Sequence, residues 1–250
     1  MKLSVSGIDF AYRSTAVLEN VTFDVHPGEL LCILGVNGAG KSTLLKCINR
    51  ILSPRRGQVL VDKKAVFDMP QREVALHMAY VPQKHPETQL SVFETVLIGR
   101  RPHVRWSLRD NDYAIVEQVL NQLGLNQLAM RPVSSLSGGQ LQKVIIAQAL
   151  AQSPGVLLLD EPISNLDLRN QIEVMRLVRD VARTHGLAAV VAIHDLNMAL
   201  RFGDKFLFLK DQKVQAITDR SGFTPDLVER VYDVPVSLHE CNGYPTVVPA

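Results

Sequence analysis

Residues 35–42 read GVNGAGKS and fit the pattern G-x-x-x-x-G-K-[ST], which suits the binding of phosphate groups. The apolar run ELLCILG leads into this segment, and the helical pattern LLKCINRIL follows it and ends near Pro54. Glycines let successive N–H groups converge on phosphate oxygens, and the following helix adds the positive end of its dipole. Lys41 should reach the β- and γ-phosphates, and Ser42 should bind Mg²⁺. A glycine-rich turn with an incidental lysine is the alternative, but the context favours a nucleoside triphosphate site.

Two acidic residues, Asp160 and Glu161, follow the apolar run GVLLL, which predicts a buried strand. Ligands of open parallel sheets lie at the carboxyl ends of the strands, so both acids should face the phosphates. Asp160 would hold Mg²⁺ through its water shell, and Glu161 would orient and polarise the attacking water as a general base. Carboxylates that only cap a loop or a helix are common, but that alternative leaves the preceding apolar run unexplained.

A second glycine motif, LSGGQ, occupies residues 136–140. Ser137 is predicted to cap a helix, and Gly138 and Gly139 would expose N–H groups at its positive end. This is a second anion site in a chain that already has a phosphate loop. Two such surfaces suggest that two chains share each nucleotide. A flexible loop before a helix is the alternative, and the position of the motif between the others argues against it.

The hydrophobic patterns predict the elements that position these motifs. LSVSGIDFAY and VLENVTFDV alternate, which indicates an antiparallel β-layer, and GQVLVDKKAV adds a hairpin element. The runs ELLCILG, HMAYVPQ, GVLLLDEP and LAAVVAIHD alternate with helical segments, which predicts a parallel sheet with right-handed crossovers. Residues 91–136 are mostly helical, with an exposed, proline-broken stretch at 100–103. KFLFLKDQKVQAI predicts a hairpin, and a short helix follows at 225–232.

Composition limits the class of protein. The chain has 250 residues, 46% of them hydrophobic, which excludes a disordered or collagen-like protein. A net charge of +2 is too balanced for a dedicated nucleic-acid-binding protein. Apolar stretches such as 187–193 are too short to span a membrane, and the N-terminus lacks the apolar region of a signal peptide. Cys32, Cys47 and Cys241 follow no metal-ligand spacing, so we expect reduced thiols in the core of a soluble intracellular protein.

On these motifs the chain resembles the nucleotide-binding subunit of an ATP-binding cassette (ABC) transporter over essentially all of its length. GVNGAGKST is similar to the Walker A motif of that family, LSGGQ to its signature and VLLLDEP to its Walker B motif. The resemblance implies an α/β fold of the P-loop NTPase class, a single domain over 1–250. Within it we expect a RecA-like core with an antiparallel β-layer and C-terminal tail at 1–84 and 154–250. The inserted helical subdomain, with the signature, would occupy 85–153.

The resemblance also implies individual roles. Tyr12 in FAY is similar to the aromatic residue that stacks on adenine, and Gln83 in VPQ to the glutamine that touches Mg²⁺ and the attacking water. Asp167 in SNLD would cross a dimer interface, and His194 in AIHD would contact the γ-phosphate. The expected catalytic residues are Glu161, His194 and Gln83, and the expected Mg²⁺ ligands are Ser42, Gln83 and Asp160. The expected ATP-binding residues are Tyr12, Gly35, Asn37, Gly38, Ala39, Gly40, Lys41, Ser42, Thr43, Ser137, Gly138, Gly139, Gln140 and Asp167.

Further stretches favour one branch of the family. VFETVLIGRRPH, IIAQALAQ, LDLRNQIEVM, HDLNMALRF and VERVYDVPVSL are similar to importers of ferric siderophores, haem and cobalamin. Gln212 departs from the glycine, and Asn170 from the histidine, that are frequent in the family at these places. An ABC ATPase for another small solute and a non-transport, ATP-dependent dimerisation switch are the alternatives. The presence of Glu161 favours an enzyme that hydrolyses ATP over a dimerisation switch.

The importer resemblance implies the partners. We expect a homodimer at the cytoplasmic face of the membrane, bound to separate permease subunits, with an extracytoplasmic substrate-binding protein acting through the permease and no nucleic acid. The coupling surface should lie between Gln83 and the signature, in the inserted helical segment. Its candidate residues are Thr88, Val92, Thr95, Val96, Gly99 and Arg101.

Overall fold

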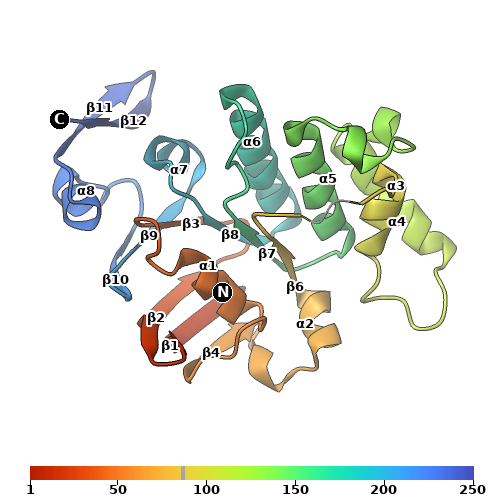
Figure 1. Cartoon of the computed structure of the whole chain (residues 1–250), viewed down its shortest axis with the longest axis horizontal. Coiled ribbons are helices and arrows are strands. Elements are labelled where there is room, and N and C mark those ends of the chain that lie inside the picture. The colour runs from red at the N-terminus through yellow and green to blue at the C-terminus, as the bar shows by residue number, and fades with distance from the viewer. Residues whose placement is uncertain (86–87) are drawn as a thin grey trace.

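The computed structural model describes residues 1–85 and 88–250 and centres on a six-stranded sheet with strand order β10-β9-β3-β8-β7-β6 (Figure 1). Neighbouring strands pair in parallel from β9 to β6, whereas β10 joins β9 in antiparallel fashion. The strands are β3 (Leu30–Leu34), β6 (Met78–Val81), β7 (Val156–Asp160), β8 (Ala188–Ala192), β9 (Lys205–Lys210) and β10 (Lys213–Thr218). The expected, mostly parallel sheet is therefore confirmed.

A second sheet of four antiparallel strands forms the N-terminal β-layer, in the order β2-β1-β4-β5. Its strands are β1 (Leu3–Tyr12), β2 (Thr15–Val25), β4 (Arg56–Val61) and β5 (Lys64–Ala65). Val5 pairs with Phe23 and Ile8 with Val21, so β1 carries one extra residue between these pairs. This bulge returns Ile8 to the buried face that Val5 occupies. The expected antiparallel layer is confirmed.

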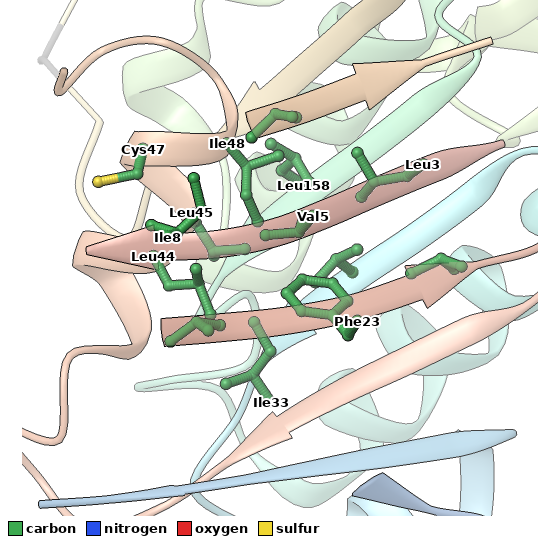
Figure 2. Packing of buried hydrophobic residues seen from close by; sticks show 14 of the residues in the cluster. Leu3, Val5, Ile8, Phe23, Ile33, Leu44, Leu45, Cys47, Ile48 and Leu158 are labelled. Carbon is green, nitrogen blue, oxygen red and sulfur yellow. The ribbon is translucent and has the colours of Figure 1, made fainter. Parts of the chain in front are cut away.

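The central sheet is buried on both faces, which explains why its strands are continuously apolar. Leu31 and Ile33 of β3 belong to the cluster between the sheet, the antiparallel layer and helix α1 (Lys41–Ile48). Figure 2 shows Ile33 among Leu44 of α1 and Phe23 of β2 in this cluster. The intervening β3 residues, such as Leu30 and Leu34, belong to the cluster on the opposite face. Each fully buried leucine or isoleucine side chain stabilises the fold by about 1.5–3 kcal/mol.

Helices cover that opposite face (Figure 1). They are α5 (Gly138–Ala151), α6 (Leu168–His185), α7 (Leu196–Phe202) and α8 (Pro225–Tyr232). In α6 the buried residues Val174, Val178 and Ala182 recur at helical spacing, so one stripe of the helix faces the sheet. The side chain of Asp167 caps its first turn, and Gly186 ends it in a left-handed conformation.

The helical region that follows β6 has a third hydrophobic cluster. It contains α3 (Val92–Ile98), α4 (Asp110–Gln122), the short 3₁₀ segments η2 (Asn126–Leu128) and η3 (Val133–Ser135), and part of α5. Arg100 is 4% exposed, and its Nε donates to Asp112 Oδ1 at 2.9 Å. The expectation that Arg100 is exposed is therefore wrong, because this ion pair ties the loop after α3 to α4. The backbone N–H of Arg109, and then Arg100, lower the pKa of Asp112.

Several elements were not predicted from the sequence. They are η1 (Val66–Asp68), α2 (Gln71–His77), α7, and the C-terminal hairpin of β11 (Val236–Cys241) and β12 (Tyr244–Pro249). The hairpin places Cys241 in an exposed position, so the expectation that all three thiols lie in the core is wrong, whereas Cys32 and Cys47 are buried. None of the helices in the described part of the chain combines the length and the hydropathy that a membrane span requires.

Candidate active site

The phosphate loop, residues 35–40, connects the carboxyl end of β3 to the first turn of α1. Gly38 and Gly40 have φ angles of +81° and +102°, which residues with side chains rarely adopt. A Cβ atom on Gly38 would meet no atom within 4 Å, so the middle of the loop is open. A phosphate group therefore has room against the loop backbone at the N-terminus of α1, where the helix dipole favours negative charge.

Lys41 lies at the first position of α1 and is 5% exposed. Its Nζ donates hydrogen bonds to the carbonyl oxygens of Gly35 at 2.7 Å and Val36 at 3.1 Å. Burial lowers the pKa of Lys41, while the nearby carboxylates of Glu161 and Asp160 raise it. A partly desolvated cation whose hydrogen bonds go to neutral carbonyls gains more from phosphate oxygens than an exposed lysine does. The loop and Lys41 together fit a polyphosphate.

Asp160 ends β7 and is 3% exposed. Its Oδ1 accepts a hydrogen bond from Ser42 Oγ at 2.7 Å, and its Oδ2 accepts one from Tyr80 Oη at 3.0 Å. A hydroxyl and a carboxylate oxygen this close, beside the phosphate loop, are the hard ligands that Mg²⁺ prefers. The donor set therefore fits a magnesium ion that is held also by phosphate oxygens and water.

Glu161 follows in a strained conformation, with φ of +48°. Its Oε2 accepts a hydrogen bond from Gln83 Nε2 at 2.7 Å and lies 3.9 Å from His194 Nδ1. The three residues come from the ends of β7, β6 and β8, which meet at one edge of the sheet. The structure thus brings together the three side chains that the sequence predicts to be catalytic. A carboxylate held by an amide can orient a water and accept its proton.

The signature segment lies at the N-terminus of α5. Ser137 Oγ accepts a hydrogen bond from the Gln140 N–H, and Gln140 Oε1 accepts one from the Ser137 N–H. This capping box leaves the amides of Gly138 and Gly139 without a partner among the residues that the structure describes. A Cβ on Gly139 would lie 2.1 Å from Asn170 Oδ1, so the segment packs closely against the start of α6.

Comparisons with known proteins agree with this geometry. The family model described as "ABC transporter" matches residues 18–164. An uncharacterised ABC transporter ATP-binding protein of Methanocaldococcus jannaschii is 48% identical over 249 residues, which are 100% of this chain and 98% of that protein. The chain belongs to the ABC transporter family. It is therefore an ABC transporter ATPase, a member of a family that binds ATP.

Relatives named for the import of a particular cargo also align with this ABC transporter ATPase. The cobalamin import ATP-binding protein of Halobacterium salinarum is 39% identical over 253 residues, and the match covers 100% of this chain and 64% of that protein. The iron(3+)-hydroxamate import ATP-binding protein of Bacillus subtilis is 36% identical over 241 residues, covering 94% of this chain and 89% of that one.

Solved structures extend the comparison. A chain from an inward-facing structure of a transporter described as metal-chelate type is 31% identical, with a TM-score of 0.87 and coverage of 100% and 97%. A dimeric ABC transporter cassette is 28% identical, with a TM-score of 0.77, and covers 88% of this chain and 100% of that one. Dimeric cassettes thus occur among the structural relatives of this ATPase.

The remaining predicted ATP-binding residues come from the phosphate loop, the start of α1, the end of β1 and the start of α6. Tyr12, at the end of β1, is 48% exposed and meets Phe10 edge to face with ring centroids 4.8 Å apart. One face of its ring is therefore open for stacking. Asn37 is exposed in the loop, and Ala39 and Thr43 flank the point where the loop enters α1.

Asp167 lies just before α6. Its Oδ1 accepts a hydrogen bond from the Asn170 N–H at 2.8 Å, so Asp167 already serves as the cap of α6.

A groove of about 970 Å³ lies between α2, β6, α3 and α5. Four of the predicted coupling residues line it, namely Thr88, Thr95, Gly99 and Arg101. The prediction is wrong for Val92 and Val96, which are fully buried because they form the apolar face of α3 in the third cluster. A Cβ on Gly99 would lie 2.1 Å from the carbonyl oxygen of Gln148, so a larger residue there would also displace α3 from α5.

Two tyrosines at the site were missed by sequence reasoning. Tyr80 contacts Asp160, as described above, and Tyr232 Oη accepts a hydrogen bond from the Gly35 N–H at 2.9 Å. Tyr80 lies on a strand that was predicted, three residues before Gln83, so its proximity to the acids could have been inferred from strand order. Tyr232 comes from α8, almost 200 residues after Gly35, and no local pattern connects the two.

Proposed function

We propose that the chain is the ATP-hydrolysing subunit of an importer that moves a metal chelate (an iron-siderophore or haem) or cobalamin across the cytoplasmic membrane. Relatives named for cobalamin and iron(3+)-hydroxamate import align with nearly the whole chain, and a metal-chelate type transporter shares its fold at 31% identity. The observation that carries the enzymatic part is the contact of Glu161 with Gln83 beside Lys41 and Asp160. That cluster has the groups that hydrolysis of a bound triphosphate requires.

Mg²⁺·ATP supplies the γ-phosphoryl group and the metal that offsets its charge. Lys41 would hold the phosphate oxygens, and Ser42, Asp160 and Gln83 would hold the metal. Glu161 accepts the proton of the attacking water, and the amide of Gln83 fixes the carboxylate through the 2.7 Å hydrogen bond. His194 would donate a hydrogen bond to the γ-phosphate. Positioning and electrostatics of this kind account for most of the catalysis of phosphoryl transfer.

The site is completed by a second copy of the chain. Ser137, Gly138, Gly139 and Gln140 make no hydrogen bond to the phosphate loop within the described part of the chain. Their N–H groups and helix dipole face a γ-phosphate only if another subunit supplies it. The functional unit is therefore a head-to-tail homodimer with two ATP molecules, each between Lys41 of one chain and Ser137 of the other. The dimeric cassette that resembles this chain supports this arrangement.

The groove receives a cytoplasmic helix of a separate permease subunit, which brings the ATPase to the cytoplasmic face of the membrane as a peripheral subunit. Ile98, Pro102 and Val104 give it an apolar lining, and Arg101 adds a positive charge at its wall. An extracytoplasmic substrate-binding protein would act through the permease. We expect no nucleic-acid partner, because a net charge of +2 is too balanced for a dedicated nucleic-acid-binding protein.

Rotation of the helical region would transmit ATP hydrolysis to the permease. We divide the single domain, 1–250, into a core at 1–84 and 154–250 and a helical subdomain at 85–153. The third cluster supports the division because most of its members come from 92–151. Val181 and Leu187 also belong to it, so the subdomain packs against α6 and the segment after it.

Reconstitution tests this function. Proteoliposomes with the chain and the membrane protein that co-purifies with it would be given cobalamin, a ferric hydroxamate or haem, together with ATP. We expect one cargo to accumulate with the wild type and none with Glu161→Gln. Hydrolysis without accumulation of any of the three would favour another small solute. Binding and dimerisation without steady hydrolysis would favour the non-transport switch.

The docking surface has its own test. Arg101→Glu reverses a charge at the groove wall without touching the nucleotide site, so the ATPase rate of the isolated subunit should stay near the wild-type value. Assembly with the permease, measured by size-exclusion chromatography, and cargo uptake should fall. Glu117→Arg on the exposed side of α4 is the matched control, because it changes charge outside the groove. Normal assembly and uptake with Arg101→Glu would place the coupling surface elsewhere.

A further inference from the structure

The carboxyl end of β6 contacts both acidic residues of the site. Gln83 Nε2 donates to Glu161 Oε2 at 2.7 Å, and Tyr80 Oη donates to Asp160 Oδ2 at 3.0 Å. Tyr80 pairs with Leu158 across the parallel β6–β7 ladder, two residues before Asp160, so the backbone itself fixes the distance between the two residues. The chain therefore holds each carboxylate with its own donor from one short segment.

The same tyrosine also reaches the groove. Tyr80 is half-buried and lines the groove together with Ile145, Gln148 and Ala149 of α5 and Thr95 of α3. Tyr80 thus borders the space that the proposed permease helix would occupy, while its hydroxyl donates a hydrogen bond to the carboxylate that the nucleotide site uses. A tyrosine hydroxyl is protonated at neutral pH, so it is available there as a hydrogen-bond donor.

We propose that Tyr80 is a positioning residue that fixes Asp160 for Mg²⁺ and links the occupancy of the groove to the metal site. The proposed role of Tyr80 in metal binding depends only on the Tyr80–Asp160 contact. The link to the groove rests on the function proposed above, because it needs a permease helix in that groove.

The hydrogen bonds that Asp160 accepts explain why the Tyr80 hydroxyl matters. Both oxygens of Asp160 now accept a hydrogen bond, one from Ser42 and one from Tyr80, and together these bonds fix the plane of the carboxylate. Ser42 is itself an expected metal ligand. When its oxygen binds the metal, the direction of its O–H group is no longer set by the hydrogen bond to Asp160 alone. Tyr80 is then the donor that keeps the carboxylate plane in place. A helix that presses on the ring from the groove shifts this donor and, with it, the carboxylate.

The metal part is tested on the isolated subunit with Tyr80→Phe, which keeps the ring that lines the groove and removes only the hydroxyl. Binding of Mn²⁺, as a paramagnetic substitute for Mg²⁺, would be measured by electron paramagnetic resonance with a non-hydrolysable ATP analogue present. We expect about tenfold weaker Mn²⁺ binding, the lower end of the effect of one lost hydrogen bond to a charged group. Affinity for the analogue without metal should be unchanged. Tyr113→Phe, on the exposed side of α4, is the matched control and should bind Mn²⁺ as the wild type does.

The link to the groove is tested on the complex with the permease. In the wild type, assembly should change the Mn²⁺ affinity of the ATPase, and in Tyr80→Phe this response should be lost although assembly persists. Equal Mn²⁺ binding by Tyr80→Phe and wild-type subunits overturns the proposal. A wild-type complex whose Mn²⁺ affinity equals that of the isolated subunit overturns the link to the groove. Normal assembly of Arg101→Glu would instead count against the docking site, and the measurement on the isolated subunit would still stand.

Discussion

The phosphate loop and the signature segment both lie at helix N-termini, yet the chain supports them differently. The loop is held by distant parts of the molecule: Tyr232 binds the N–H of Gly35, and a Cβ on Gly35 would lie 2.1 Å from the carbonyl oxygen of Leu209. The signature is held by its own first turn, through the reciprocal hydrogen bonds of Ser137 and Gln140.

The phosphate loop and the signature segment also differ in their exposure to solvent. Lys41 is 5% exposed, whereas Ser137 and Gly138 are open to solvent. A buried cation with carboxylates nearby is a site that one chain completes by itself. The exposed N-terminus of α5, which its own first turn caps, can instead bind an anion that is held by another molecule. The difference supports the proposal that the monomer binds ATP and that the dimer hydrolyses it, and the two steps can be tested separately.

The largest effect is expected for Glu161→Gln, which keeps the side-chain shape and removes the proton acceptor. Hydrolysis should fall about 10²- to 10⁴-fold while ATP binding is preserved. Because ATP is then not consumed, the dimer should accumulate with ATP and Mg²⁺, as measured by light scattering. Glu117→Gln, an exposed glutamate of α4, should behave like the wild type. A Glu161→Gln subunit that stays monomeric, even when assembled with its membrane partners, would contradict the shared site.

Lys41→Ala and Gly138→Asp should separate the two regions. Losing the lysine removes a charge-assisted contact, so ATP should bind the monomer about 10- to 100-fold more weakly by calorimetry. Gly138→Asp should leave that affinity within about twofold but abolish dimerisation, because a carboxylate would face the γ-phosphate of the other chain. An acidic residue in the first turn suits the dipole of α5, so the fold should persist.

The neutral Gly138→Ala is the control for Gly138→Asp. Its Cβ would lie 3.5 Å from Leu166 Cδ2, an ordinary contact, so this variant should still dimerise. Wild-type hydrolysis by Gly138→Asp would show that the signature does not face a triphosphate.

The sequence was sufficient for the elements whose signal is local. Apolar runs of five residues in β3 and of four residues before Asp160 in β7 predict strands buried on both faces, and the glycines before Lys41 predict the phosphate loop. The order of strands then places Asp160, Glu161 and His194 at one edge of the sheet, because parallel strands end on the same side. These predictions succeed because backbone periodicity and strand direction decide them.

What the sequence could not supply depends on contacts between distant segments. Val92 and Val96 were expected in the groove, but only the packing of α3 on α4 and α5 decides which face of that helix is buried. Cys241 was expected in the core, but a hairpin at the edge of the molecule carries it into solvent. The partnership of Tyr232 with Gly35 has no sequence signature, because α8 meets the loop only in the folded chain.

His194→Ala should affect hydrolysis more than binding. His194 is half-exposed and lies 3.9 Å from Glu161, so its contact with the γ-phosphate matters mainly during turnover. We expect about tenfold slower hydrolysis, from the loss of one hydrogen bond to a charged group, and nearly unchanged ATP affinity. Both quantities would be measured on the same preparation. His239→Ala, in the C-terminal hairpin, is the control. Equal losses of binding and hydrolysis in His194→Ala would refute its assigned role.

The smallest effect should come from Tyr232→Phe, which tests how far support of the phosphate loop by distant residues contributes to ATP binding. The phenylalanine ring keeps the packing of α8 on the core and leaves the Gly35 N–H without its acceptor. An unpaired buried N–H costs about 1 kcal/mol, so KM for ATP should rise about fivefold while kcat changes little.

Burial raises the pKa of Tyr232 to about 12, and the hydroxyl is therefore neutral below that pH. The difference between the wild type and Tyr232→Phe should thus be constant from about pH 6 to pH 9. Tyr244→Phe in the C-terminal hairpin is the matched control, because it removes a hydroxyl far along the chain from the loop. An unchanged KM in Tyr232→Phe would mean that the loop needs no support from α8, and the contrast with the signature would then rest on burial alone.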